Sequence, residues 1–373
     1  MSLPWSFFLF WCILISIPPL IRLGSNHLNV MKPITIIGGG LAGLSLGIGL
    51  RQRGVPVTIF EAGKYPRHRV CGEFISGAGQ RSLERLGLRE KIINADVHAA
   101  KTAMFFSGKL ISELKILPEE ALCISRFTLD NLLAEDFLKL GGKFHSSTRW
   151  NEKFDEGIVR ASGRRVQSNV NGWRYFGLKV HAQNVNLAAD LEMYFVPNGY
   201  VGICQLSGDE VNICGLFRSR TALPDLSTHW RDWLRGPRGS ALESRLAQAN
   251  FDESSFCSVA GLSLEPQKAA THSECCIGDS LTMIPPVTGN GMSMAFESAE
   301  IALEPLTNYS ARKISWNNAK KNIARCCDEN FSQRLTWANV LEMGLFRPGL
   351  RHFSLLLASR VPGFWSAFYS RTR

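Results

Sequence analysis

The chain contains 373 residues, of which 45% are hydrophobic and 20% are charged. This balance is typical of a globular protein, and it excludes a disordered chain, a collagen and a coiled coil. The length predicts two domains. Only one stretch, within the first thirty residues, is apolar enough to span a bilayer, so a polytopic membrane protein is excluded as well.

The formal net charge of +10 is concentrated near the C-terminus. Residues 311–373 hold 11 Lys or Arg and 3 Asp or Glu, whereas the rest of the chain is almost neutral. Such a segment fits a helical cap with a solvated arginine face, a contact with an anionic membrane surface, or a nucleic-acid contact. Aromatic and aliphatic residues are interleaved with the arginines, which favours the cap or the membrane. We therefore expect no nucleic-acid partner.

The first thirty residues are open to three interpretations. No charged residue precedes Arg22, and Leu3–Ile21 is just long enough to anchor the chain in a membrane. The positive residues follow this stretch, which would leave the body of the protein in the cytoplasm. Alternatively, Met31 is the true start and the segment is an artefact. A cleaved signal peptide is the third interpretation, but a basic n-region and an A-x-A cleavage site are missing.

The ten cysteines form no CxxC pair and no Cys/His spacing of metal ligands. We therefore predict reduced thiols, no metal and a cytoplasmic protein, with membrane association through the first thirty residues or the basic tail left open.

A glycine motif early in the chain predicts a dinucleotide site. Residues 34–37, Ile-Thr-Ile-Ile, are expected to form a buried strand, and G-x-G-x-x-G follows at once at Gly38, Gly40 and Gly43. The first glycine permits the tight turn, the second lets a pyrophosphate approach the backbone, and the third lets the helix pack on the strand. This helix is expected to present its N-terminal N–H groups, at Leu41 and Ala42, to the phosphates.

An acidic residue in the expected position supports the same site. A second strand is predicted at 57–60, and it ends at Glu61, 18 residues after Gly43. A carboxylate there accepts hydrogen bonds from a ribose diol. Because an acid would repel a 2′-phosphate, we expect the site to bind FAD or NAD and not NADP.

A second glycine-rich loop, at residues 278–292, precedes a predicted helix at 293–303. It is interpreted as a second helix N-terminus whose amides face an anionic or electron-rich group. A flavin needs such a loop, because its ribityl chain must be held and its N1–C2=O edge becomes negative on reduction. NAD needs no second loop, so we predict FAD. The expected ligands in this loop are Gly278, Asp279 (for a polyol hydroxyl), Pro286, Gly289, Asn290, Gly291 and Met292.

Together these motifs resemble the FAD-dependent monooxygenase superfamily with the para-hydroxybenzoate hydroxylase fold, and within it the geranylgeranyl reductase-like branch. Residues 65–73 look like the branch's P-x-x-x-x-C-G element beside the flavin ring, and residues 124–130 look like its R-x-x-x-D-x-x-L helix start. The resemblance implies that Arg69, Cys71, Gly72 and Arg126 approach the cofactor. The mid-chain Asp-Gly of the superfamily is replaced here by residues 161–164, Ala-Ser-Gly-Arg, and the absence of W-x-W-x-I-P argues against a flavin halogenase.

The resemblance implies an α/β fold with an FAD-binding Rossmann-like domain of the GR2 type, an inserted antiparallel β-sheet substrate domain and a C-terminal helical segment. The expected boundaries are 1–30 for the apolar extension, 31–100, 123–165 and 255–305 for the FAD-binding domain, 101–122 and 166–254 for the substrate domain, and 306–373 for the basic helical segment. Period-two alternation predicts strands of the inserted sheet at 173–182, 191–196, 200–205 and 211–217.

One face of this sheet is expected to roof a cavity over the flavin. The candidate wall residues are Phe176, Leu178, Met193, Phe195, Ile203 and Ile213. A wall so poor in titratable groups suits a lipid, an isoprenoid or a flat polyketide-like aromatic. Lys179 and His181 share the opposite parity, so we do not expect them to act as acid or base.

We predict an FAD-dependent oxidoreductase that acts on a hydrophobic small molecule. In one reaction of this scaffold, reduced flavin traps oxygen as a C4a-hydroperoxide and hydroxylates or epoxidises the substrate. In the other, flavin delivers hydride to an alkene, as in geranylgeranyl reductases. Cys71 is a candidate proton donor, although a buried cysteine is more often inert.

The electron source is not encoded in a second nucleotide fingerprint, so NADPH or NADH is expected to bind only transiently as the reductant. A non-catalytic flavin-binding assembly protein is the remaining alternative.

Overall fold

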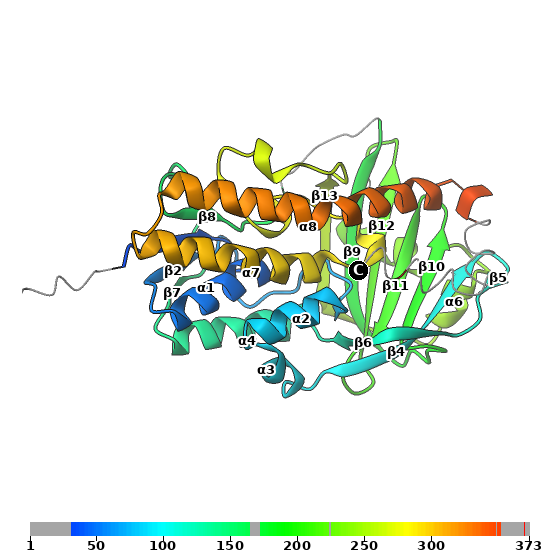
Figure 1. The fold of residues 1–373 in the computed structure, drawn as a ribbon. Helices are drawn as coiled ribbons and strands as arrows, with labels where there is room; N and C mark the ends of the chain where they lie inside the picture. The colour runs from blue at the N-terminus through cyan, green and yellow to red at the C-terminus, as the bar shows by residue number, and fades with distance from the viewer. Residues whose placement is uncertain (1–30, 165–171, 224, 348, 352–368, 370–373) are drawn as a thin grey trace, which may run out of the picture. The chain divides into compact units, whose positions relative to one another are not determined.

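The computed structural model describes residues 31–164, 172–223, 225–347, 349–351 and Tyr369. The expectations for the apolar extension 1–30 and for most of the tail beyond residue 351 lie outside the described residues. Figure 1 shows the described elements in chain order.

The first glycine motif lies in a parallel sheet. The first strand, β1 (Ile34–Ile37), is followed by α1 (Leu41–Gln52) and by β2 (Val57–Phe60), which pairs in parallel with β1. The other strands are β7 (Lys143–His145), β8 (Ile158–Arg160) and β14 (Cys275–Cys276), and the order β14-β8-β1-β2-β7 is parallel throughout. The order reverses at β1, and the carboxyl end of a strand at such a switch point is where open α/β sheets bind ligands.

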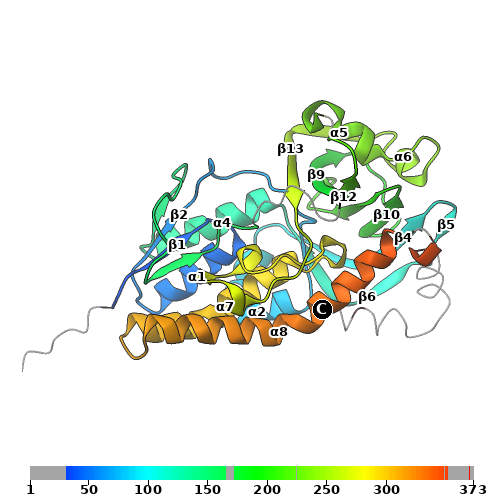
Figure 2. The ribbon, with the colours of Figure 1, turned by 90° about the horizontal axis from the view of Figure 1, so that it is seen from above.

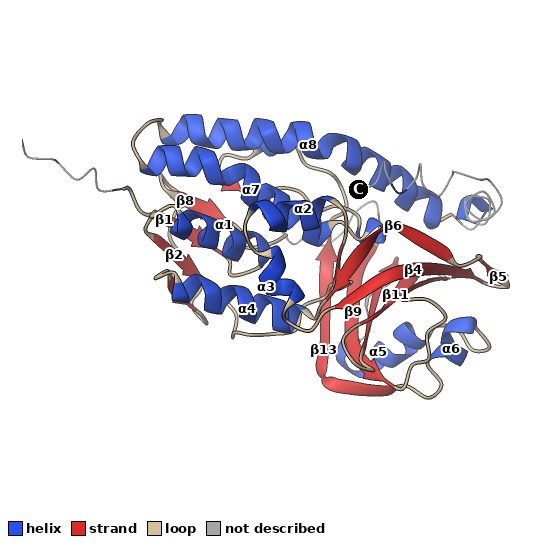
Figure 3. Cartoon of the chain, turned by 60° about the horizontal axis from the view of Figure 1, so that its bottom comes forward, coloured by secondary structure: helices blue, strands red, loops and turns tan. Residues whose placement is uncertain are grey.

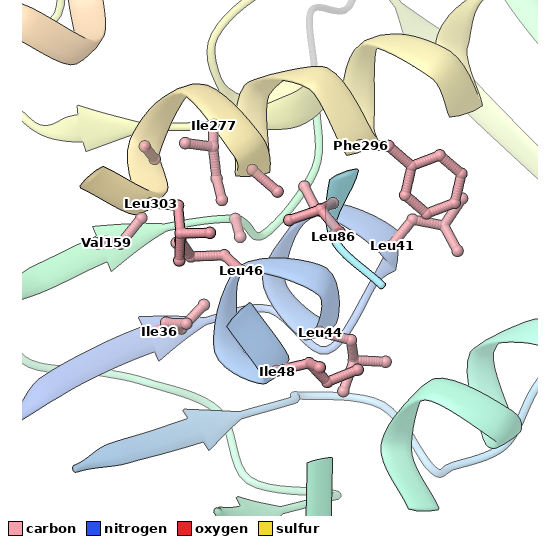
Figure 4. Close-up of a cluster of buried hydrophobic side chains, with 14 of the residues drawn as sticks. Ile36, Leu41, Leu44, Leu46, Ile48, Leu86, Val159, Ile277, Phe296 and Leu303 are labelled. Carbon is pink, nitrogen blue, oxygen red and sulfur yellow. The ribbon is translucent and has the colours of Figure 1, made fainter. Parts of the chain in front are cut away.

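Helix α1 is buried along almost its whole length. Every residue from Leu41 to Leu50 is buried, because α1 lies between the sheet and the neighbouring helices α4 (Arg126–Lys139) and α7 (Gly291–Ser310). Glycines in α1 allow this: a Cβ on Gly49 would lie 3.0 Å from the Leu303 side chain of α7. Figure 4 shows Leu303 of α7 beside Leu46 of α1.

The second sheet has nine strands and differs from the expectation in one respect. The predicted strands appear as β9 (Arg174–Gln183), β10 (Leu191–Val196), β11 (Gly199–Gln205) and β12 (Val211–Ser219). The others are β3 (Phe74–Ile75), β4 (His98–Ser107), β5 (Leu110–Ile111), β6 (Lys115–Cys123) and β13 (Asn250–Leu262). The sheet is mixed and not purely antiparallel, because β10 pairs in parallel with β4.

The two faces of this sheet have different neighbours. Helices α5 (Leu226–Arg235) and α6 (Ala241–Arg245) cover one face, as Figure 3 shows. The other face receives α8 (Trp316–Leu345) and the loop that precedes α7. The small helices α2 (Ala78–Arg85) and α3 (Arg89–Ile93) connect β3 to β4.

The first part of the basic C-terminal segment is a helix, α8 (Trp316–Leu345), which lies along α7 (Figure 2). Its buried residues recur every fourth position, at Ala319, Ile323, Cys327, Phe331 and Leu335, as expected for a helix with one face in the core. The expectation of a C-terminal helical segment is therefore confirmed over this range. Among the described helices, none combines the length and the hydropathy needed to cross a membrane.

Phe137 of α4 tests the importance of this packing. Its ring is fully buried beside Gly47 of α1 and Gly142. We expect Phe137→Ala to lower the free energy of unfolding by about 3–5 kcal/mol, because it leaves a cavity between α1 and α4. Leu138→Ala, at a side chain that is 50% exposed, is the matched control and should cost less than about 1 kcal/mol in urea denaturation. Equal losses would contradict this account.

Candidate functional site

The first glycine loop leaves open space in front of α1. Gly38 has a φ of +120°, and a Cβ there would lie 2.2 Å from the carbonyl oxygen of Ala161. A Cβ on Gly43 would lie 2.0 Å from the carbonyl oxygen of Gly38. By contrast, a Cβ on Gly40 meets nothing closer than a nitrogen of Arg126, at 4.0 Å. Packing therefore requires Gly38 and Gly43, whereas Gly40 borders space that a phosphate can occupy.

The start of α1 favours an anion. Gly40 is the N-cap without a side-chain cap, so the N–H groups of Leu41 and Ala42 have no acceptor within the helix. Arg126 lies beside this end and donates from Nε and Nη2 to Asp130 at 2.8 and 2.9 Å. Burial alone would lower the pKa of Arg126, but the Asp130 carboxylate raises it above its ordinary value. The helix dipole and a charged guanidinium therefore act on the same space.

Glu61 is an ionised acceptor at the end of β2. Its carboxylate accepts hydrogen bonds from the backbone N–H groups of Gly39 (3.0 Å) and Gly63 (2.8 Å) and from the side chains of Arg67 (3.0 Å) and Arg69 (3.4 Å). Burial would raise the pKa of Glu61, but Arg69, the two amides and Arg67 outweigh it and leave the pKa below its ordinary value. The side chain of Arg67 is 45% exposed. Arg67 is therefore the donor that a ribose hydroxyl can displace.

The second glycine loop lies against the first. Gly278 has a φ of +58°, and a Cβ there would come within 2.9 Å of the Ala42 Cβ in α1. Solvent reaches the next side chain, Asp279, yet the protein atoms around it raise its pKa by desolvation, against the attraction of Arg164 and Arg126. Two loops separated by about 240 positions in the sequence thus border one space.

The start of α7 repeats the arrangement at α1. Gly289 is left-handed, with a φ of +66°, and a Cβ there would lie 2.1 Å from the ring of Phe74. Asn290 is the N-cap, and a Cβ on Gly291 meets nothing within 4 Å. Each loop therefore combines glycines required by packing with one glycine, Gly40 or Gly291, that faces open space. Pro286 begins the short 3₁₀ turn before Gly289, and Met292 is buried in the first turn of α7.

Cys71 and Gly72 lie between Arg126 and the second sheet. The Cys71 carbonyl accepts a hydrogen bond from Asn212 of β12 at 2.9 Å, and the Gly72 carbonyl accepts one from the Cys204 thiol of β11 at 3.2 Å. Burial raises the pKa of the Cys71 thiol, and the charge of Arg126 opposes this only in part. Cys71 is therefore a protonated thiol at neutral pH and not an activated thiolate.

The sheet register divides the six candidate wall residues between two faces. Phe176, Leu178, Ile203 and Ile213 are buried in one cluster with residues of α5 and α6, on the face away from the glycine loops. Met193 and Phe195 lie on the opposite face, in a cluster that includes Val287 and Met283 of the second loop. The structure thus corrects the expectation that the six residues form a single wall. Alternation within each strand shows which residues share a face of that strand, but it does not show which face of the neighbouring strand lies beside it.

Sequence reasoning missed a buried charged cluster on the face of Met193. Glu73, Lys179 and His181 are 0%, 0% and 2% exposed. Glu73 lies 2.6 Å from Nε2 of His181 and 3.5 Å from Nζ of Lys179. Lys179 and His181 were not expected to act as acid or base, because they point to the face of β9 opposite to Phe176. The strand pairing shows that this face is the one that carries Met193 and lies toward the glycine loops: Lys179 pairs with Cys214, Cys214 with Gly202, and Gly202 with Met193.

The residues present fit a flavin dinucleotide. Two helix starts border one space, a charged arginine and an ionised glutamate flank the first, and Asp279 is available to a hydroxyl-bearing chain at the second. Among the described residues, no group of His, Cys, Asp and Glu side chains could hold a metal ion.

Comparisons with known proteins indicate an FAD-binding domain. A family model described as FAD binding domain matches residues 31–172, and one described as squalene epoxidase matches residues 166–343. Monooxygenase 1 of Arabidopsis thaliana is 31% identical over 104 residues, which are 27% of this chain and 26% of that protein. Squalene epoxidase erg1 of Aspergillus fumigatus is 36% identical over 75 residues, which are 20% of this chain and 15% of that protein.

Conditioned medium factor receptor 1 of Dictyostelium discoideum is 22% identical over 344 residues, which are 77% of this chain and 66% of that protein. The chain thus spans less than two thirds of the length of each of these relatives.

Solved structures share the fold at low identity. The flavin-dependent brominase Bmp2 has a TM-score of 0.71 and 16% identity, covering 91% of this chain and 92% of that one. PqsL of Pseudomonas aeruginosa, a probable FAD-dependent monooxygenase, has a TM-score of 0.65 and 15% identity, covering 85% of this chain and 97% of that one. These similarities confirm the predicted fold class and carry no information on the reaction.

Residues 31–172 therefore match an FAD-binding domain of the kind found in FAD-dependent monooxygenases, and residues 166–343 are squalene epoxidase-like. The expected FAD-dependent oxidoreductase agrees with the names of two of the relatives. The geranylgeranyl reductase-like branch and the NADPH or NADH reductant stay predictions.

Gly40 and Gly43 offer a matched test of cofactor placement. We expect Gly40→Val to fold with a loss of at most about 1 kcal/mol but to purify without FAD, because its side chain enters the space beside Arg126. Gly43→Ala should lower the free energy of unfolding by about 1–3 kcal/mol, since its Cβ collides with the backbone of Gly38. Flavin absorbance and thermal melts measure both effects. A Gly40→Val protein that stays yellow would show that the pyrophosphate lies elsewhere.

Proposed function

We propose that the protein is an FAD-dependent monooxygenase that inserts one oxygen atom into a hydrophobic substrate. The observation that carries the proposal is the meeting of the two glycine-lined helix starts beside an apolar face of the second sheet. Bound FAD, once reduced by a nicotinamide, supplies the electrons that activate O₂. The residues of this chain bind that cofactor, orient the substrate and exclude water.

Residues of this chain are proposed to bind each part of the dinucleotide. The α1 N-terminus and Arg126 hold the pyrophosphate, and Glu61 holds the ribose of the adenosine. Asp279 accepts from a hydroxyl of the ribityl chain. The amides at Gly291 and Met292 stabilise the edge of the flavin ring that becomes negative on reduction, because they begin α7 and carry its positive dipole end.

The substrate lies against the sheet face of Met193 and Phe195. Their cluster also contains the apolar side chains of Leu216 and Val287. Of the charged groups on this face, Lys179 is fully buried and paired with Glu73, and Arg218 stacks on the ring of Phe346 at the border of the cluster. Such a wall favours an isoprenoid, another lipid chain or an apolar aromatic over a charged metabolite. The squalene epoxidase-like match over residues 166–343 supports the isoprenoid class.

Two alternative functions are kept because particular observations favour them. The protonated thiol of Cys71 suits an alkene reductase of the geranylgeranyl reductase type, which needs a proton donor after hydride transfer. The missing mid-chain Asp, replaced at residues 161–164, suits a flavin-binding assembly protein without turnover. If the substrate is an isoprenoid or another lipid, we propose that the protein contacts a membrane surface through the first thirty residues or the basic tail.

Isotopic labelling separates these functions. We expect FAD-loaded protein, supplied with NADPH or NADH, squalene-like alkenes or alkylphenols and ¹⁸O₂, to yield product containing one ¹⁸O atom by mass spectrometry. An alkene reductase would instead yield a product two hydrogen atoms heavier and free of ¹⁸O. Flavin that no donor reduces would support the non-catalytic alternative and end the enzymatic proposal.

Met193 tests the substrate wall. We expect Met193→Ala to raise KM for the hydrophobic substrate about tenfold, as expected when about 1.4 kcal/mol of apolar contact is lost. Met104→Ala is the matched control, because Met104 packs on the opposite face of the same sheet and should leave KM unchanged. A larger KM effect at Met104 would place the substrate on the face of α5 and α6.

A further inference from the structure

Five titratable side chains form a continuous chain of contacts that the proposed function does not use. At its outer end, Glu210, with a side chain that is 37% exposed, lies 3.3 Å from Nδ1 of His181. Nε2 of His181 lies 2.6 Å from Oε2 of Glu73. Oε1 of Glu73 lies 3.5 Å from Nζ of Lys179, and this nitrogen lies 3.0 Å from Nδ1 of His68. The chain therefore runs from solvent to a fully buried carboxylate and out again to a half-buried histidine.

The innermost group, Glu73, is held against residues that border the cofactor site. Its carboxylate accepts a hydrogen bond from the backbone N–H of Arg126 at 2.8 Å, and its own N–H donates to the sulfur of Cys71 at 3.4 Å. Glu73 also has a φ of +57°. This conformation is uncommon for a residue with a side chain, and such residues gather at functional sites because only surrounding structure can hold them there.

The surroundings shift the pKa values of the two histidines in opposite directions. Burial would lower the pKa of His181, but Glu210 and Glu73 outweigh it and raise the pKa above its ordinary value. Burial and the charge of Lys179 lower the pKa of His68 to about 4. Burial would raise the pKa of Glu73, but His181 and Lys179 hold it below its ordinary value. The two carboxylates on either side of His181 therefore favour its protonated form.

Charged and titratable groups surround His181 on several elements. The groups that face it from the packed elements are Glu73 and His68 from the segment between β2 and β3, Lys179 of its own strand, Glu210 before β12 and Asp252 of β13.

The proposed reaction needs a protected supply of protons. Oxygenation of a substrate consumes one O₂, one reduced nicotinamide and one proton, and it releases the oxygenated product, the oxidised nicotinamide and water. Because bulk water must be kept from the reacting atoms, the proton has to arrive through the protein. Glu210, His181 and Glu73 are the described groups that link solvent to the Cys71 edge of the site.

We propose that Glu210, His181 and Glu73 conduct protons from solvent to the cofactor site, and that Lys179 and His68 position Glu73. In each transfer, Nδ1 of the neutral His181 ring takes a proton from Glu210, which solvent then reprotonates, and the N–H bond at Nε2 of the resulting imidazolium breaks as an O–H bond forms on Glu73. Glu73 releases this proton to the reaction at the cofactor site, which consumes it, and rotation of the ring returns an unprotonated nitrogen to Glu210. The imidazole is suited to this step because its two nitrogens exchange protons on opposite sides of the ring. The inference rests on the proposed function.

Proton uptake without substrate tests the path. FAD-loaded protein is photoreduced anaerobically in weak buffer, and a pH-indicator dye follows the proton that reduction draws in. We expect His181→Asn to slow this uptake by about 100-fold and Glu210→Gln to slow it by about tenfold, with most of the rate restored in Glu210→Asp. Glu113→Gln, which removes a carboxylate that is 78% exposed in the loop between β5 and β6, is the matched control and should keep the original rate.

The exposed position of Glu210 keeps the test independent of folding. If Glu210→Gln retains its FAD and its thermal stability but takes up protons at the original rate, the relay is refuted and the proposed function stands. If the protein does not retain FAD at all, the proposed function fails first.

A second measurement needs no cofactor. In protein labelled with ¹⁵N-histidine, NMR should show His181, assigned through His181→Asn, titrating above the range of a free histidine, while His68 stays neutral to about pH 4. Glu210→Gln should lower the midpoint of His181, because an adjacent anion is removed. A His181 midpoint that Glu210→Gln does not move would refute the outer link of the relay.

Discussion

The structure depends on a steric constraint, the close contact of backbone segments that only glycine permits. A Cβ at Gly38, Gly43 or Gly278 would come within 3 Å of another segment. These contacts draw β1, α1 and the loop before α7 together, so that the N-termini of two helices border one space. Because unsatisfied N–H groups at both ends favour negative charge, the same packing that closes the fold creates an anion-binding site.

The second sheet adds a different kind of surface to this site. Its face toward α5 and α6 is an apolar core, whereas its other face combines the apolar side chains of Met193 and Phe195 with buried Lys179 and His181. Buried charges at such positions are costly unless they are paired, and here each has an ionic partner in Glu73. Glu73 therefore joins the segment that follows β2 to the sheet, and it links the electrostatics of the substrate wall to the residues around Cys71.

Local patterns predicted the elements around the first glycine motif well. The strand before Gly38, the helix after Gly40 and the acid at Glu61 depend on neighbours within about 30 residues, and the structure shows all three elements. The sheet strands were also predicted within two residues of their observed ends. Alternation along one strand, however, cannot show how it is aligned with the next. The six wall residues were therefore assigned to one face, although Phe176 and Phe195 lie on opposite faces.

By itself, the sequence determined where backbone must approach backbone, because a glycine at a turn and a β-branched run before it act over a few residues. It also determined the residue types that a flavin dinucleotide requires. Only the tertiary structure decided which distant groups meet: Gly278 with Ala42, and Glu73 with Lys179 and His181. The physical reason is that strand register arises from pairing between different strands, and the pairing of buried charges arises from contacts between segments more than 100 residues apart. No local pattern along the chain records either.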